Sequence, residues 1–419
     1  MSELIRQFES AAELGATAQR LRARTLERDL SPSQVIEILE RWGEALRGPE
    51  LDPIPGASFL RLWLRRGTLE AIVLRELGQE GLHGGWRTEG HTRLKAFPLG
   101  VVGHWPAGNI EIQPLLSMSC ALLGGNACLV RIPTGLIMET RILIEKLSQV
   151  AGSEVLRERI CLASFDHEHA ELQRAMAGSV DGAMIWGGAE AVTQVRALPF
   201  PSWARIAVFG PRLSVAAMDG ASWSDATARD SWCRRLARDV WQFDQQACSS
   251  PQVLFLERCT AGDLMEFATA LAAAFKEENQ LHPRRDIHPA LTSAICLSRA
   301  TWLLEAEGRH ALFPQTPDWT LLLGTGTKIP SPTQGRTLSV LLVDDLLDPI
   351  ARFDGMVQTL GLGMSDEVKE AALTNAAARN GVDRIVKLGR MHVFGSPWDG
   401  TDLVRPMMRL VRHVPAENG

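Results

Sequence analysis

From residue 97 onward, short apolar runs alternate with helix-like stretches, and this alternation limits the folds open to the chain more than any other feature. The apolar runs occupy 97–103, 127–132, 159–165, 180–186 and 204–210. The intervening stretches occupy 111–123, 137–150, 169–178 and 189–198. Strands separated by helices predict a parallel sheet with right-handed crossovers, so we expect an α/β fold.

A second set of the same kind follows the first. We expect strands at 214–219, 253–257, 320–324 and 337–343, and helices over 224–242, over 261–277 and near 366–379. Residues 311–336 are rich in Pro and Gly, as an irregular surface segment would be. Residues 1–80 have a helical pattern, with Ser31 and Ser33 as candidate N-caps. A chain of 419 residues is expected to form two or three domains.

Composition excludes several classes of function. A net charge of −5 gives no support for nucleic-acid binding, which usually leaves an excess of basic residues. The chain has no Tyr, so no mechanism can use a Tyr hydroxyl as its acid. It has no G-x-S-x-G serine-hydrolase elbow and no G-x-G-x-x-G dinucleotide fingerprint. The uncharged run 112–130 contains Gly-Gly-Asn at 124–126, which predicts a buried helix followed by a buried strand and not a membrane span.

The cysteines indicate a reducing compartment. There are seven, with no C-x-x-C, so we expect neither a disulfide framework nor a zinc site. Asp166-His167-Glu168-His169 offers metal-ligand types, but no third and fourth partners accompany it, so we expect no metal. The charged N-terminus lacks the apolar segment of a signal peptide, and we expect a cytoplasmic protein.

Cys248 differs from the other cysteines in its surroundings. Cys128 and Cys161 lie inside apolar runs, where free cysteines are usually buried. Cys248 follows a polar Gln-Gln pair and precedes Ser-Ser-Pro at the start of an expected strand. Reactive thiolates are held at such boundaries, because free backbone N–H groups there stabilise negative charge. Cys248 is therefore a candidate nucleophile, and an incidental loop cysteine is the alternative.

Asn109 lies in a Gly- and Pro-rich turn that follows the apolar run at 97–103. An Asn in this position is commonly a turn residue or the N-cap of the next helix. The functional alternative is a side-chain amide that donates a hydrogen bond to a reaction centre. The residues alone leave both interpretations open.

Together these regions resemble the aldehyde dehydrogenase superfamily, and most closely its LuxC-type fatty acyl-CoA reductases. The matching motifs are Gly-Asn-Ile at 108–110, Gly-Gly-Asn-Ala and Arg-Ile-Pro within 124–133, Asp-Gly and Trp-Gly-Gly within 181–188, Phe-Gly at 209–210, Asp-Gln-Gln-Ala-Cys-Ser-Ser-Pro-Gln at 244–252, Val-Asp-Arg-Ile-Val and Gly-Arg within 382–390, and Trp-Asp-Gly at 398–400. The resemblance covers roughly residues 90–405. The cysteine loop and the Trp-Asp-Gly motif are its most specific parts.

The resemblance implies a role for each matching residue. Cys248 matches the nucleophile, and Asn109 matches the side-chain donor of the oxyanion hole. Arg131 stands where the wider superfamily has a Lys that contacts the adenosine ribose. The other expected cofactor-binding residues are His104, Trp105, Thr134, Gly187, Gly188, Phe209 and Gly210. NADPH is the expected cofactor, with NADH as the alternative, because a guanidinium pairs well with a 2′-phosphate.

One departure from the superfamily bears on the reaction. Oxidative aldehyde dehydrogenases carry a water-activating Glu two residues before the Gly that matches Gly210, and this chain has Val208 there. The resemblance therefore implies reduction of an acyl thioester, on CoA or on an acyl-carrier protein, to an aldehyde through a thioacyl-cysteine. An oxidative aldehyde dehydrogenase and a non-catalytic scaffold are the alternatives.

The implied architecture is aldehyde-dehydrogenase-like, with a Rossmann-type cofactor domain and an α/β catalytic domain. We expect residues 1–80 to pack as a helical segment on the cofactor domain. That domain is expected at 81–212, with 385–419 returning to it, and the catalytic domain at 213–384. A homo-oligomer is expected from the family, and an acyl-transfer protein is a candidate partner.

Overall fold

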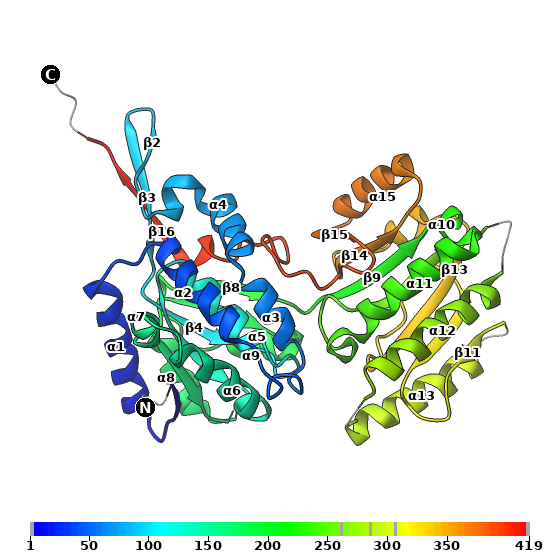
Figure 1. Cartoon of the computed structure of the whole chain (residues 1–419), viewed down its shortest axis with the longest axis horizontal. Coiled ribbons are helices and arrows are strands. Elements are labelled where there is room, and N and C mark those ends of the chain that lie inside the picture. The colour runs from blue at the N-terminus through cyan, green and yellow to red at the C-terminus, as the bar shows by residue number, and fades with distance from the viewer. Residues whose placement is uncertain (1–3, 167, 260–262, 285–286, 306–307, 416–419) are drawn as a thin grey trace. The chain divides into compact units, whose positions relative to one another are not determined.

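The structure, a computed structural model, describes residues 4–166, 168–259, 263–284, 287–305 and 308–415 (Figure 1). It divides into two compact units, the first within Met1–Pro211 and Phe394–Gly419 and the second within Arg212–Val393. Each unit is built on its own mainly parallel sheet, which confirms the predicted α/β fold.

The N-terminal segment of the first unit is helical, as predicted. Its helices are α1 (Ala11–Glu27), α2 (Pro32–Ala45), α3 (Ala57–Trp63) and α4 (Arg66–Leu82). Ser31 caps α2 through a reciprocal capping box with Gln34, whereas Ser33 lies inside the helix. The pattern did not reveal the short strand β1 (Ile5–Gln7), which pairs in parallel with a strand far along the chain.

A six-stranded parallel sheet forms the centre of the first unit, in the order β1-β6-β5-β4-β7-β8. Its remaining strands are β4 (Val101–Trp105), β5 (Ala127–Ile132), β6 (Ile160–Ser164), β7 (Gly182–Trp186) and β8 (Arg205–Phe209). The connecting helices are α5 (Gln113–Leu123), η1 (Thr134–Leu136), α6 (Ile137–Ser148), α7 (Glu154–Arg157), α8 (Ala170–Gly178) and α9 (Ala189–Arg196). The chain runs outward from β4 to β5 and β6, then returns to β7 on the other side of β4. The switch point of the sheet therefore lies between β4 and β7, and ligands of open α/β sheets bind at such points.

The prediction of one strand over 97–103 was wrong. The structure has two strands there, β3 (Thr92–Pro98) and β4, separated at Gly100 by a left-handed backbone with φ of +135°. Buried Asn126 holds the break, because its Oδ1 accepts hydrogen bonds from the N–H groups of Leu99 (2.8 Å) and Gly100 (3.2 Å). As a result β3 leaves the parallel sheet and joins β2 (Arg87–Glu89) and β16 (Met408–His413) in an antiparallel one.

The second unit contains a seven-stranded sheet in the order β11-β12-β13-β10-β9-β14-β15, parallel except for the pair β11 and β12. Its strands are β9 (Leu213–Met218), β10 (Pro251–Glu257), β11 (His310–Leu312), β12 (Thr320–Thr325), β13 (Thr337–Val343), β14 (Val357–Gly363) and β15 (Arg384–Lys387). Its helices are α10 (Gly220–Ser224), α11 (Ala226–Trp241), η2 (Gln242–Gln245), α12 (Leu264–Leu281), α13 (Pro289–Glu305), α14 (Leu347–Ile350) and α15 (Glu367–Arg379). A last turn, η3 (Arg405–Met407), belongs to the first unit. Residues 261 and 262 of the predicted helix 261–277 lie outside the described residues.

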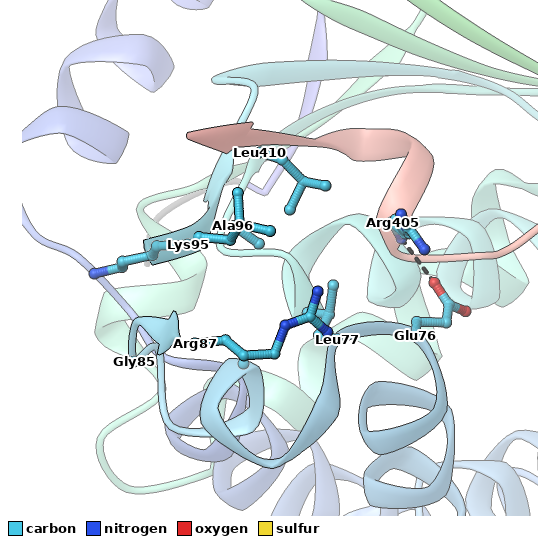
Figure 2. Close-up of a pocket in the computed structure, with 10 residues that line it drawn as sticks. Glu76, Leu77, Gly85, Arg87, Lys95, Ala96, Arg405 and Leu410 are labelled. Carbon is cyan, nitrogen blue, oxygen red and sulfur yellow. Dashed lines mark hydrogen bonds between the residues drawn. The ribbon is translucent and has the colours of Figure 1, made fainter. Parts of the chain in front are cut away.

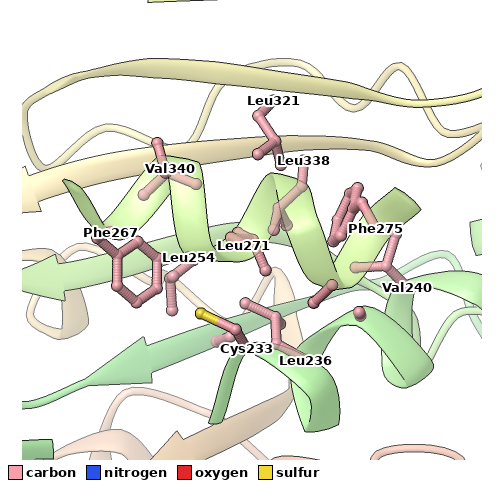
Figure 3. Packing of buried hydrophobic residues seen from close by; sticks show 14 of the residues in the cluster. Cys233, Leu236, Val240, Leu254, Phe267, Leu271, Phe275, Leu321, Leu338 and Val340 are labelled. Atoms are coloured by element: carbon pink, nitrogen blue, oxygen red, sulfur yellow. The ribbon is translucent and has the colours of Figure 1, made fainter. Parts of the chain in front are cut away.

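Helices α11 and α12 pack side by side on one face of this sheet (Figure 3). Leu236 and Val240 of α11 meet Leu271 and Phe275 of α12 above Leu254 of β10, all of them fully buried. Burial of a side chain of this size contributes about 1.5–3 kcal/mol. The C-terminal end of α11 and the N-terminal end of β10 are thereby fixed in place, and the Cys248 loop connects them.

Candidate functional site

Cys248 lies in the short loop that connects α11 to β10 and includes the turn η2. The loop begins with three successive residues in the left-handed region, Phe243, Asp244 and Gln245, with φ of 55°, 54° and 62°. Such backbone costs about 1–3 kcal/mol per residue and occurs mainly where the surrounding structure enforces it. Cys248 itself is half-buried.

Two buried arginines hold the left-handed turn. The carboxylate of Asp244 pairs with Arg284 at 3.1 Å and with Arg336 at 2.6 Å. The Arg336 guanidinium also lies 4.4 Å from the ring centre of Trp241, the last residue of α11. Because each partner is charged and largely desolvated, removal of one would leave the others uncompensated.

Gln245 binds the same turn to the sheet. Its buried side chain donates from Nε2 to the carbonyls of Pro251 and Thr337, both at 2.8 Å. Its Oε1 accepts from the Thr337 N–H at 2.7 Å. The amide therefore joins the starts of β10 and β13 and satisfies three backbone groups that would otherwise be buried without partners.

The peptide that follows Cys248 is held from two sides. Ser214 Oγ donates to the Cys248 carbonyl at 2.7 Å, and Ser249 Oγ lies 2.9 Å from Nδ1 of His392. Nε2 of His392 lies 2.7 Å from the carbonyl of Asp239 in α11. Burial lowers the pKa of His392 to about 4, so the imidazole is neutral at pH 7. The sequence did not reveal this contact, because Ser249 and His392 are 143 residues apart.

Several other cysteines lie in environments that disfavour a thiolate. Cys128 and Cys161 are buried in the first unit, as predicted. Burial raises the pKa of the Cys161 and Cys233 thiols to about 12, and it raises that of Cys128 further. Among the described residues, the cysteines that are not buried are Cys248, Cys259 and Cys296. Of these three, Cys248 alone lies in the loop that carries the family motif.

Asn109 lies in an exposed turn of the first unit, between β4 and α5. The alternative that it caps the following helix is wrong, because α5 begins at Gln113 and Ile112 occupies its N-cap. Gln113 instead folds back onto the turn, where its Oε1 accepts a hydrogen bond from the Ala107 N–H at 2.7 Å. The role of Asn109 as an oxyanion-hole donor stays a prediction.

Most of the predicted cofactor residues gather at the carboxyl ends of four neighbouring strands of the first unit. Arg131 lies near the end of β5 and Thr134 just beyond it, while Gly187 and Phe209 lie at the ends of β7 and β8. Ring centres of Phe209 and Trp186 are stacked 4.0 Å apart. This edge includes the switch point, where open α/β sheets bind ligands.

Gly210 is required by a close approach of two turns. A Cβ added to Gly210 would lie 2.4 Å from the Gly187 carbonyl oxygen, and its φ of +112° disfavours any other residue. Gly188 is different, since a Cβ there would meet nothing within 4 Å. Gly188 precedes the first residue of α9, so the N-terminus of that helix has open space beside it.

His104 and Trp105 have side chains inside the core. His104 is fully buried with Nδ1 2.8 Å from Ser117 Oγ, and burial lowers its pKa to about 3. Trp105 donates from Nε1 to Gln173 Oε1 at 2.8 Å. Only their backbone atoms at the end of β4 could contact a cofactor in this structure, and their assignment stays a prediction.

A pocket elsewhere in the first unit contains none of the predicted site residues. It lies between α4 and the antiparallel sheet, beside Arg87, Lys95 and Arg405 (Figure 2). The carboxylate of Glu76 at its wall accepts hydrogen bonds from the backbone N–H groups of 403, 404 and 405, at 2.9, 2.8 and 2.7 Å. Glu76 therefore has a structural role, because it anchors the turn before β16.

The described residues contain neither a cluster of metal ligands nor a helix suited to crossing a membrane. Within these residues, no three His, Cys, Asp or Glu side chains are grouped closely enough to hold a metal ion. His167, one of the metal-ligand types noted in the sequence, lies outside them. None of the described helices combines the length and apolar character that a membrane crossing requires.

Comparison with known proteins identifies relatives over most of the chain. The long-chain acyl-protein thioester reductase 2 of Photobacterium leiognathi is 24% identical over 360 residues, 84% of this chain and 71% of the relative. The long-chain acyl-protein thioester reductase of Vibrio harveyi is 23% identical over 372 residues, 88% of this chain and 75% of the relative.

Solved structures show the same fold at low sequence identity. An aldehyde dehydrogenase from Brucella melitensis is 14% identical with a TM-score of 0.73, covering 96% of this chain and 89% of that one. An NADP-dependent enzyme of E. coli is also 14% identical, with a TM-score of 0.71 and coverage of 96% and 90%. The predicted aldehyde-dehydrogenase-like fold is therefore confirmed.

The family model described as acyl-CoA reductase (LuxC) matches residues 37–413. The match begins well before residue 90, where the motifs recognised in the sequence begin, and includes most of the N-terminal helices. The predicted resemblance is thus confirmed over nearly the full length, and the chain belongs to the acyl-CoA reductase (LuxC) family.

Proposed function

We propose that this chain reduces a long-chain acyl thioester to an aldehyde, with NADPH as the cofactor and Cys248 as the nucleophile. Family membership over 37–413 is the observation that carries the proposal. The names of the relatives specify an acyl group on a protein. The family description specifies an acyl group on CoA, so an acyl-carrier protein or CoA is the proposed carrier. An acyl-transfer protein as partner and a homo-oligomeric state are further proposals.

In this mechanism the Cys248 thiolate attacks the thioester carbonyl and displaces the carrier thiol, leaving an acyl group on the cysteine. Asn109 and the Cys248 N–H are the proposed donors to the oxyanion that forms. Each such donor lowers the barrier by about 3–4 kcal/mol when it is held in place. Ser214 holds the nucleophile on its carbonyl side, because its Oγ donates to the Cys248 carbonyl and fixes the peptide that follows.

The family and the fold imply a nicotinamide cofactor, and the carboxyl edge of the first sheet fits one. Arg131 Nε is buried without a hydrogen-bond partner among the described residues, so this donor near the end of β5 can bind an anionic group, with the Asp166 carboxylate as a nearby opposite charge. The open space at Gly188, before α9, suits a phosphate at a helix N-terminus. When bound, the cofactor supplies hydride to the acyl group. The residues proposed to hold it are Arg131, Thr134, Gly187, Gly188, Phe209 and Gly210, with backbone atoms of His104 and Trp105.

Val208 favours the reductase over the oxidative alternative. Its side chain is half-buried and packs against the apolar cluster of the first unit, and it cannot accept a proton from water. An acyl group on Cys248 would then lack general-base assistance for hydrolysis, which contributes about 10²- to 10⁴-fold elsewhere.

The test is a panel of acyl-CoA and acyl-carrier-protein thioesters with NADPH, scored by the aldehyde formed. We expect stoichiometric loss of NADPH absorbance, and expect Cys248→Ala to abolish turnover while NADPH still binds. Cys259→Ala is the matched control, because Cys259 is also half-buried in the second unit. Turnover retained by Cys248→Ala, or absent with every thioester in the unmodified protein, would contradict the proposal.

A further inference from the structure

A buried imidazole lies behind the nucleophile loop and is absent from the family motifs recognised in the sequence. His392 contacts the loop at two points. Its Nδ1 is 2.9 Å from Ser249 Oγ, and its ring meets that of Phe243 edge to face with centres 5.7 Å apart. His392 therefore touches the loop both at the left-handed turn and at the residue next to Cys248.

The hydrogen-bond pattern fixes the protons of this contact. A backbone carbonyl can only accept, so Nε2 of His392 must donate to the Asp239 carbonyl. Nδ1 of the neutral ring is then an acceptor, and the Ser249 hydroxyl must be the donor. The hydrogen bond to Nδ1 therefore fixes the orientation of the Ser249 hydroxyl.

The segment that carries His392 is itself anchored. The Asp239 carboxylate accepts hydrogen bonds from the N–H groups of Gly389 at 2.5 Å and Met391 at 3.2 Å. Asp239 is 3% exposed and lies in α11, whose packing on α12 and the sheet is dense. The imidazole is therefore anchored to a helix that is packed in the core of the second unit.

The geometry points to His392 as a positioning residue for Cys248. Through Ser249 it holds one side of the Cys248–Ser249 peptide, while Ser214 holds the other through the Cys248 carbonyl. The carbonyl side of Cys248, and with it the Cα atom that carries Sγ, is thus held in place before substrate arrives. This role rests on the proposed nucleophile function of Cys248, and it assigns no proton transfer to His392.

Ser249→Ala, His392→Phe and the double variant test this inference in the full-length protein. The readouts are the rate of alkylation of Cys248 by iodoacetamide, kcat, and the KM for NADPH. We expect each single variant to lower the alkylation rate and kcat by about 10- to 100-fold, the range that small misplacements of reacting groups produce. The double variant should be no worse than the more severe single variant, because both remove the same contact. The KM for NADPH should stay unchanged.

Further variants separate positioning from a general loss of structure. His392→Asn keeps an acceptor oxygen near the position of Nδ1, so it should recover part of the rate lost in His392→Phe. Ser298→Ala is the matched control. Ser298 lies on α13 in the same unit, and its half-buried hydroxyl accepts a hydrogen bond of 2.9 Å from Thr333, which the substitution removes. If His392→Phe does not fold, Ser249→Ala and His392→Asn decide the question.

Unchanged alkylation and kcat in a folded Ser249→Ala protein would overturn the inference, as would additive losses in the double variant. Absence of thioester reduction in the unmodified protein would instead count against the proposed function. Alkylation of Cys248 needs neither thioester nor cofactor, so the two failures are distinguishable.

Discussion

Gln245→Glu tests whether one buried amide enforces the left-handed turn before Cys248. The substitution preserves shape and exchanges the Nε2 donor for an oxygen. Nε2 donates to the carbonyls of Pro251 and Thr337 at 2.8 Å, so an ionised carboxylate would face two carbonyl oxygens. The new carboxyl should therefore be protonated in the folded protein. Its one hydroxyl can donate to only one of the two carbonyls, so the other is left without a donor.

The free energy of unfolding should fall by an amount that depends on pH. Protonating a Glu at pH 7 costs about 4 kcal/mol, and at pH 5 about 1 kcal/mol, given an ordinary pKa near 4.3. The carbonyl left without a donor adds about 1–3 kcal/mol at both pH values. The folded state holds a proton that the unfolded state releases above pH 4.3, so stability falls as pH rises. We expect a loss of about 5–7 kcal/mol at pH 7 and about 2–4 kcal/mol at pH 5.

Urea unfolding of the full chain at pH 5 and pH 7, followed by circular dichroism, measures this difference. Gln315→Glu is the matched control, because it makes the same charge change at an exposed position of the second unit. That control should stay within about 0.5 kcal/mol of the unmodified protein. An equal loss at both pH values, or a loss no larger than that of the control, would refute the reasoning.

Three further predictions concern the first unit. Arg131→Ala should raise the KM for NADPH by about 10- to 100-fold, which corresponds to the loss of a hydrogen bond to a charged group. The KM for NADH should rise far less. Equal increases in the two KM values would show that Arg131 does not contact the 2′-phosphate. Val208→Glu should shift the product of aldehyde oxidation from acyl-CoA toward free acid. The assay supplies aldehyde and NADP⁺ at pH 8, so that the new carboxyl is ionised even if burial raises its pKa. Rapid acid formation by the unmodified protein without CoA would mean that another residue supplies the base. His104, whose pKa burial lowers to about 3, stays neutral in the folded state while the unfolded state gains a proton below pH 6.5. Acidification to pH 5 should therefore cost about 2 kcal/mol through this group, and the loss should be absent in His104→Gln when unfolding free energies at pH 7 and pH 5 are compared.

The sequence predicted those parts of the fold that depend on local periodicity. The strand at 127–132 and the helix at 169–178 agree closely with β5 and α8, because each has a continuous pattern bounded by turn residues. The break at Gly100 was missed, since its cause is Asn126, which is distant in sequence and acts through its side-chain amide. Helix α13 was also missed; it buries only Ile295, Arg299 and Trp302 among its described positions.

For the site, motif positions could be predicted and their supporting contacts could not. Cys248 and the glycines were recognisable because chemistry or backbone geometry restricts those positions to few residue types. Gln245, Ser214 and His392 act through contacts made only in the folded chain, and neither spacing nor composition marks them. His104 and Trp105 were predicted to bind a cofactor from their place in the motif alone, and the motif does not show that both faces of β4 are buried.

The division of the first unit between the two ends of the chain sets an order on its assembly during synthesis. Asn126 donates to the carbonyl of Met407, 281 residues later, and Glu76 accepts from Val404, 328 residues later. Both are buried, so a nascent chain carries Asn126 and Glu76 without these partners until residues 404–407 have left the ribosome. The second unit is a continuous stretch and has no such dependence. Domains generally fold as they emerge, so the second unit can complete its sheet before the first unit has received the C-terminal residues that close its antiparallel sheet.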